Sequence, residues 1–125
     1  MNTQKKRLSE KLALAGIVLL TFLLLFASIR FERHVNRQKV MFYELQLLRT
    51  SVRLFKAIEH RDPETLRELA NGNYRFPDEP AQRRFLEYVP AVNEQGQICD
   101  PFGTPYSYEQ STGWVRSSTS GYEFW

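Results

Sequence analysis

Residues 12–29 read LALAGIVLLTFLLLFASI and contain no charged side chain. These 18 residues fall within the range of roughly 17–25 that a helix needs to cross a hydrocarbon core about 30 Å thick. A buried core helix is the weaker alternative, because a small soluble domain can hardly cover a helix that is apolar on every face. The stretch therefore predicts a membrane-spanning helix near the N-terminus.

A cleaved signal peptide is a second alternative for this segment, because the tail that precedes it is basic. The apolar run is longer than the core of about 7–15 residues that is typical of signal peptides. No small-x-small cleavage pattern follows, since Ala27-Ser28-Ile29 ends in isoleucine. We therefore expect an uncleaved signal anchor.

Basic residues lie on both sides of the span, and they bear on its orientation. Lys5, Lys6, Arg7 and Lys11 precede the span, and Arg30, Arg33, Arg37 and Lys39 follow it. The positive-inside rule gives nearly a tie. Because a short basic tail usually stays in the cytoplasm, we place the C-terminal domain outside the cytoplasm. The net charge of +3 suits lipid headgroups better than nucleic acid.

The helical pattern continues beyond the apolar run, since no Pro or Gly occurs between Ile29 and His60. Apolar residues recur there mostly every three or four positions, which indicates one face of an amphipathic helix. One helix from about Leu12 to His60 would be roughly 70 Å long. The apolar face comprises Phe31, Val35, Phe42, Leu45, Leu48, Val52 and Phe55. The opposite side carries Arg33, Arg37, Glu44, Arg49, Arg53 and Lys56.

The chain is thus predicted to contain a basic cytoplasmic tail (1–11), a transmembrane segment (12–29), an amphipathic continuation (30–60) and a small α+β domain (61–125). We expect the apolar face of the continuation to pack on the chain's own C-terminal domain, which is short and needs a surface to bury against. A coiled-coil seam with another helix is the alternative.

Residues 61–92 contain helix signals. Asp62 is a suitable N-cap and Pro63 suits a first helical position. Asn71-Gly72-Asn73 would end that helix through left-handed backbone angles. A second short helix is expected over 83–89, stopped by Pro90.

The remainder of the chain has the character of a β structure. Turns are predicted at 93–96 and, with proline and glycine in their preferred places, at 100–103. Strands at 106–109 and 114–117 would flank a hairpin turn, and 122–125 would form an edge strand. A small aromatic core is expected from Phe102, Tyr106, Tyr108, Trp114, Tyr122, Phe124 and Trp125.

The sequence offers little catalytic chemistry. The two histidines, His34 and His60, are far apart on the predicted helix, and Cys99 is the only cysteine. The chain has no glycine-rich phosphate loop, no zinc-ligand spacing and no nucleophile-elbow serine. We therefore expect neither an enzyme, nor a cofactor, nor a metal site.

The segment Asp100-Pro101-Phe102-Gly103-Thr104-Pro105-Tyr106 resembles a motif of bacterial type IV pilin-like proteins. In the major pseudopilin of type II secretion the segment reads Asp-Pro-Trp-Gly-x-Pro-Tyr, so that Phe102 replaces tryptophan. Phe85-Leu86-Glu87 followed by Asn93-Glu94-Gln95-Gly96 is a weaker match to related proteins. The motif residues are Asp100, Pro101, Phe102, Gly103, Pro105 and Tyr106.

This resemblance implies a pilin-like α+β fold, with a long N-terminal helix packed on an antiparallel sheet of three or four strands. Family members assemble helix against helix into a pseudopilus. Their leader ends in Gly, followed by Phe and then by Glu at the fifth mature position. With Glu10 aligned to that glutamate, Lys5 and Lys6 replace the glycine and the phenylalanine. We therefore expect no leader cleavage, and a subunit that stays in the membrane.

The family's calcium loop is also not expected here, because residues 117–125 offer only Glu123 as an acid. Two functions follow as hypotheses. The first is a structural pilin-like subunit or accessory protein of a secretion or pilus machine, whose partners are the lipid bilayer and other subunits of that machine, with no nucleic acid. The alternative is a membrane-tethered periplasmic binding module, which exposed Tyr122, Phe124 and Trp125 would favour.

Overall fold

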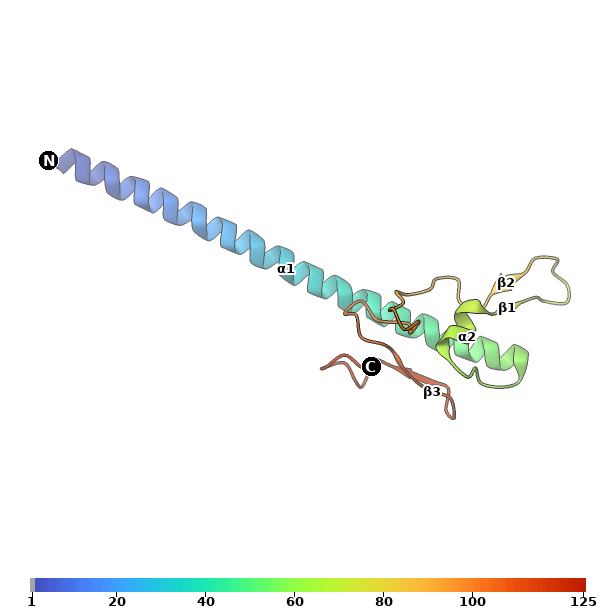
Figure 1. Ribbon diagram of the computed structural model, residues 1–125. Helices are drawn as coiled ribbons and strands as arrows, with labels where there is room; N and C mark the ends of the chain where they lie inside the picture. The colour runs from blue at the N-terminus through green and yellow to red at the C-terminus, as the bar shows by residue number, and fades with distance from the viewer. Residues whose placement is uncertain (1) are drawn as a thin grey trace. The chain divides into compact units, whose positions relative to one another are not determined.

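The computed structural model describes residues 2–125, with side chains from Thr3 onward. Its elements are α1 (Asn2–Glu59), α2 (Leu66–Asn71), β1 (Asn73–Tyr74), β2 (Arg83–Arg84), β3 (Ser107–Glu109) and β4 (Trp114–Arg116) (Figure 1). The fold is α+β, with a long helix and two small antiparallel sheets. By its contacts the chain divides into two compact units after Asn36.

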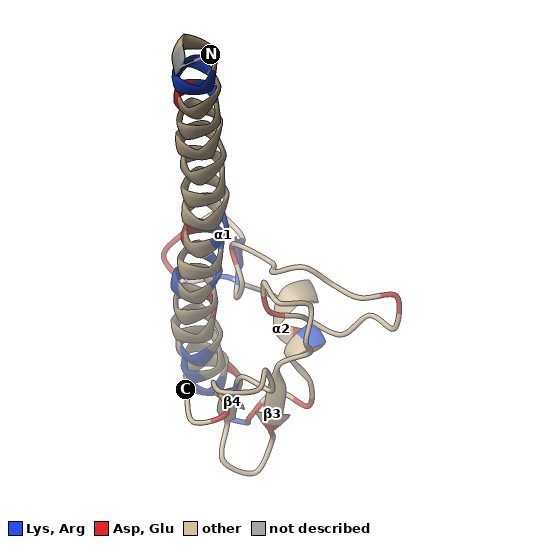
Figure 2. Ribbon diagram, turned by 90° about the vertical axis from the view of Figure 1, so that its left-hand side faces the viewer, with Lys and Arg blue, Asp and Glu red and all other residues tan. Residues whose placement is uncertain are grey.

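The first unit is the N-terminal part of α1, which contains the predicted span. Every side chain of residues 12–29 is exposed, and Figure 2 shows this stretch of the helix without charged residues. The hydroxyl of Thr21 donates to the carbonyl oxygen of Ile17 at 2.9 Å, so it needs no partner outside the helix. The segment is long and apolar enough to cross a bilayer.

The second unit is organised around one apolar stripe of α1. Met41, Leu45, Leu48, Val52 and Phe55 are each at most 3% exposed. They pack against buried side chains from the rest of the unit, namely Leu66, Leu69, Phe85, Leu86, Ile98, Tyr106 and Val115. The expected aromatic core is present only in part. Phe102, Tyr108 and Tyr122 are partly buried against this cluster, whereas Trp114, Phe124 and Trp125 are exposed. Of the seven aromatic residues proposed for it, only Tyr106 is fully buried.

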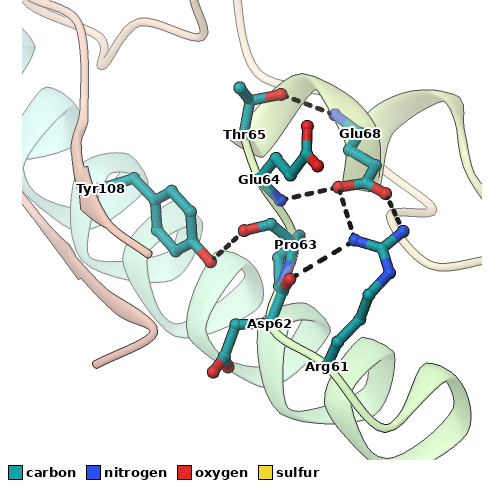
Figure 3. Close-up of polar contacts among 7 residues, drawn as sticks. All are labelled: Arg61, Asp62, Pro63, Glu64, Thr65, Glu68 and Tyr108. Atoms are coloured by element: carbon teal, nitrogen blue, oxygen red, sulfur yellow. Dashed lines mark hydrogen bonds and ion pairs between the residues drawn. The ribbon is translucent and has the colours of Figure 1, made fainter. Parts of the chain in front are cut away.

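The chain leaves α1 through a short junction, drawn in Figure 3. His60 has a φ of 56°, a left-handed angle that ends the helix. The Arg61 guanidinium then lies over the ring of Phe55 at 4.9 Å and pairs with the carboxylate of Glu68. The same carboxylate accepts the backbone N–H of Glu64 at 2.7 Å. The hydrogen bond from Arg61 lowers the pKa of Glu68.

Helix α2 begins later than predicted. Thr65, not Asp62, is its N-cap, and the Thr65 side chain accepts the backbone N–H of Glu68. Asp62 instead pairs with Lys56 at 3.1 Å, and the carbonyl oxygen of Pro63 accepts a hydrogen bond from the Tyr108 hydroxyl at 2.7 Å. These contacts hold residues 62–63 away from the helix.

The end of α2 is where the sequence predicts it, but the reason differs. Gly72 has a φ of −79°, which is not left-handed. A Cβ at this position would lie 2.9 Å from the ring of Phe85 and 2.9 Å from the carbonyl oxygen of Glu68. Glycine is therefore required here because of space, not because of backbone angle.

The expected helix over residues 83–89 is wrong, because this part of the chain pairs with the segment after α2. Asn73 is opposite Arg84, and Tyr74 is opposite Arg83, in the antiparallel pair β1–β2. Phe85 and Leu86 are both buried although they are adjacent. The ring of Phe85 lies 4.9 Å from the ring of Phe55 and 4.9 Å from that of Tyr74.

The predicted hairpin near the C-terminus is confirmed. β3 and β4 pair antiparallel, with Tyr108 opposite Val115, and Gly113 in the connecting turn has a φ of 70°. The turn at 93–96 is also present, with Gly96 at a φ of 78°. Residues 122–125 form no strand. The described residues contain two separate two-stranded sheets, so the single sheet of three or four strands is not found.

We predict that Leu48→Ala destabilises the domain by about 2–5 kcal/mol, because the side chain is fully buried and its removal leaves a cavity. The free energy of unfolding can be measured by denaturant titration of the full chain in detergent micelles. Thr50→Ala, at an exposed position two residues along α1, is the matched control and should change stability by about 0.5 kcal/mol or less. Equal losses in both variants would contradict the assignment of the core.

Candidate functional site

The motif segment 100–106 begins with a tight turn organised by Asp100, which is 2% exposed. The carbonyl oxygen of Asp100 accepts the N–H of Gly103 at 2.9 Å, and Gly103 has a φ of 86°. Carboxylate oxygen Oδ1 accepts the N–H groups of Phe102 and Thr104 at 2.9 and 3.0 Å. The Thr119 hydroxyl donates to Oδ2. One buried carboxylate thus holds both the turn and the C-terminal segment.

The end of the motif is tied to α1. Pro105 forms an isolated bridge with Cys99, and the N–H of Tyr106 donates to the carbonyl oxygen of Ile98 at 3.0 Å. The Tyr106 hydroxyl donates to Oε2 of Glu44 at 2.6 Å. Oε1 of the same carboxylate accepts a longer bond from Tyr88 at 3.4 Å.

Glu44 is a buried titratable group in this part of the fold, at 3% exposed. Burial raises its pKa, because the ionised form loses hydration, while the bonds from Tyr106 and Tyr88 act in the opposite direction. Burial, together with the hydrogen bond to Glu44, also raises the pKa of Tyr106. Tyr106 therefore remains a donor throughout the physiological range, and the pair links α1 to the motif.

The sequence interpretation missed this role of Glu44, which it assigned to the polar side of the helix. A signal was available in the spacing, because Glu44 follows Met41 by three positions and precedes Leu48 by four. Both of those residues are in the buried stripe. A carboxylate at that place needs a buried partner, and the tyrosines supply it.

The second feature is a group of aromatic side chains from the C-terminus, the motif segment and α1. We call it the aromatic surface: Phe42, Phe102, Tyr122, Phe124 and Trp125. Phe102 stacks on Tyr122 with ring centroids 5.6 Å apart, and Trp125 meets the edges of Tyr122 and Phe42 at 5.4 and 6.1 Å. The Gln38 side chain donates to the Tyr122 hydroxyl. Phe124 is 99% exposed and Trp125 is 44% exposed. The surface is ordered by its own contacts, yet much of it remains open to solvent.

The seven positions predicted as the helix contact face occupy different surroundings. Leu45, Leu48, Val52 and Phe55 are buried in the core of the second unit. Phe31 is 71% exposed and Phe42 is 51% exposed, and Val35 is half-buried. Among these seven positions, Phe31, Val35 and Phe42 are therefore the ones that remain accessible to another molecule.

No group of three or more His, Cys, Asp or Glu side chains within residues 2–125 could hold a metal ion. Cys99 is buried and has no disulfide partner, and its sulfur lies 3.5 Å from the carbonyl oxygen of Gln97.

We predict that Glu44→Gln changes the pH dependence of stability. Because the folded pKa lies above the ordinary value of 4.5, the contribution of Glu44 is fully present below about pH 4.5 and is lost as the pH rises through the raised pKa. Relative to the wild type, the variant should therefore gain stability between pH 4.5 and 7.5. Denaturant midpoints at four pH values in this range test the prediction. Glu87→Gln, at an exposed carboxylate, should follow the wild-type profile, and parallel profiles for all three proteins would contradict it.

Comparison with known proteins gives no assignment to a family. No protein-family model, no curated protein and no solved structure matches this chain. The long N-terminal apolar helix and the small antiparallel sheets are nevertheless compatible with a pilin-like fold.

Proposed function

We propose that this chain is a membrane-anchored, pilin-like structural subunit or accessory protein of a bacterial secretion or pilus machine. The observation that carries the proposal is that a single helix changes its surroundings along its length. Residues 12–29 of α1 are exposed on every face, whereas Leu45 and Leu48 of the same helix are buried in a domain core. Such a helix is both an anchor and a structural part of the domain.

The exposed apolar segment requires a cover that the chain itself does not provide. Its leucines and phenylalanines, such as Leu20 and Phe22, are more than half exposed. Contiguous apolar surface of this size is typical of contact with lipid or with other membrane helices. Gly16 has no side chain and is exposed on this segment, so a neighbouring helix could approach there closely.

The proposal places the protein in the inner membrane, with residues 37–125 outside the cytoplasm. It rests on the short basic tail, which usually stays in the cytoplasm, because the nearly equal positive charge of the two flanks favours neither orientation. With Glu10 aligned to the family's glutamate, Lys5 and Lys6 replace the glycine and the phenylalanine that mark the leader cleavage site of that family. We therefore propose an unprocessed subunit, which would act at the membrane instead of entering a filament.

The exposure of Phe124 and Trp125 favours a second candidate, a membrane-tethered binding module. Phe124 makes no ring contact among the described residues and is almost fully exposed. Trp125, by contrast, is held by ring contacts and is partly exposed, and such side chains often anchor a partner protein. In this candidate the aromatic surface binds the partner, and α1 serves only as the membrane anchor.

Site-specific cross-linking in membranes distinguishes the two candidates. In a Cys99→Ser background, Phe31→Cys places a thiol on the accessible part of the helix face. We predict disulfide cross-links from this position to the same cysteine of another copy, and none from Thr50→Cys, which is exposed elsewhere on α1. Phe124→Ala should leave the cross-linking unchanged.

Two further outcomes decide the proposal. The full chain should remain in the membrane fraction after alkaline carbonate washing, and mass spectrometry should find an intact N-terminus. A chain that is recovered as a soluble protein would contradict the anchor. A chain that stays in the membrane, forms no cross-link through Phe31→Cys and loses a partner with Phe124→Ala would favour the binding module.

A further inference from the structure

A cluster of cations surrounds an exposed tryptophan on the side of the domain where β4 meets α1. β4 alternates, so that Val115 is buried in the core while Trp114 and Arg116 lie on the outer face. Trp114 is 53% exposed. The Arg116 guanidinium lies over its ring at 5.6 Å, and the Arg49 guanidinium from α1 lies over it at 5.9 Å. Arg49 is held there by a 3.0 Å hydrogen bond to the carbonyl oxygen of Val115.

The helix adds two more cations to this group. Arg53 and Lys56 follow Arg49 by four and seven positions, so the three lie along one side of α1. A cavity of about 230 Å³ lies among them, with Val52 and Trp114 in its walls. We call this set the basic patch: Arg49, Arg53, Lys56 and Arg116, together with Trp114.

The carboxylates near the basic patch are already engaged. Asp62, which lines the cavity, pairs with Lys56 at 3.1 Å. Glu109, opposite Trp114 across the hairpin, accepts hydrogen bonds from the hydroxyls of Ser111 and Thr112 at 3.2 and 2.9 Å. Within residues 2–125, neither Arg53 nor Arg116 forms an ion pair.

Burial and the neighbouring like charges both act on Arg49. Burial lowers the pKa of its guanidinium, and the charges of Arg116 and Arg53 lower it further. The cations therefore repel one another in the free protein, and an anion placed among them would relieve that repulsion. The exposed indole face adds an apolar surface beside the charges.

We propose that the basic patch binds an acidic segment of a partner protein, with aspartate or glutamate carboxylates facing Arg49, Arg53 and Arg116 and side-chain methylenes against Trp114. The cavity has the size of one or two side chains, which suits a peptide. A nucleic acid would instead need a groove that follows its backbone, with several stacking rings. The inference does not depend on the pilin-like proposal, because it concerns a different surface of the domain.

The test uses the full chain in uncharged detergent micelles with Trp125→Phe, so that Trp114 is the only tryptophan. The probe is an acetylated hexaglutamate peptide, and hexaglutamine is its neutral counterpart. We expect a saturable change in Trp114 fluorescence with hexaglutamate and none with hexaglutamine. The double variant Arg53→Gln/Arg116→Gln should weaken binding about tenfold, since it removes two charge pairs from the complex.

Two matched variants control for net charge and for folding. Arg84→Gln removes an exposed cation from β2, outside the basic patch, and should change the affinity by less than about twofold. Arg53→Lys keeps the charge and should retain binding. Near-ultraviolet circular dichroism verifies that each variant is folded.

The proposal is overturned if Arg84→Gln weakens binding as much as the double variant, or if hexaglutamine binds equally well. It is also overturned if hexaglutamate does not bind while an oligothymidylate or phosphatidylglycerol vesicles bind through the same two arginines. The patch would then serve a nucleic acid or a lipid surface, respectively. Loss of binding in the double variant with retention in both controls supports the proposal.

Discussion

The structure of residues 37–125 depends on the burial of one stripe of α1. The two sheets have only two or three residues in each strand, and isolated two-stranded pairs of this length are marginally stable in water. Met41, Leu45 and Leu48 are almost completely removed from solvent, at about 25 cal/mol for each Å² of apolar surface. Residues 41–55 of α1 are therefore an integral part of the domain, because their buried side chains form one wall of the only core found among the described residues.

Two buried carboxylates complement this apolar contact by fixing how the loops meet the helix. Asp100 closes the turn at 100–103 and holds Thr119. Glu44 receives Tyr106, which follows the same turn. Burial of an acid is unfavourable unless its oxygens are hydrogen-bonded, and both acids meet that condition. Few alternative arrangements of the loops would satisfy the hydrogen-bond needs of both carboxylates. The motif residues therefore contribute more to the specificity of the loop arrangement than to the free energy of unfolding.

The long helix and the tight turns were predictable because they depend on local chemistry. Uninterrupted helical periodicity to residue 60 and glycine at positions 96 and 103 need no knowledge of the rest of the chain. The strand at Arg83–Arg84 and the burial of Phe85 were not predictable, since they depend on partners at residues 55 and 73–74. Glu44 was missed for the same reason: its acceptor role exists only when Tyr106 is placed against it.

Both exposed surfaces of the domain are built partly from α1, and this has a mechanical consequence. Phe42 contributes to the aromatic surface through Trp125, and Arg49 and Arg53 contribute to the basic patch. The core residues Leu45 and Leu48 lie between them in sequence. A close-packed core resists small displacements of its parts, so a load on either surface is transmitted to α1 directly. Both exposed surfaces are thus coupled mechanically to α1 through the same core.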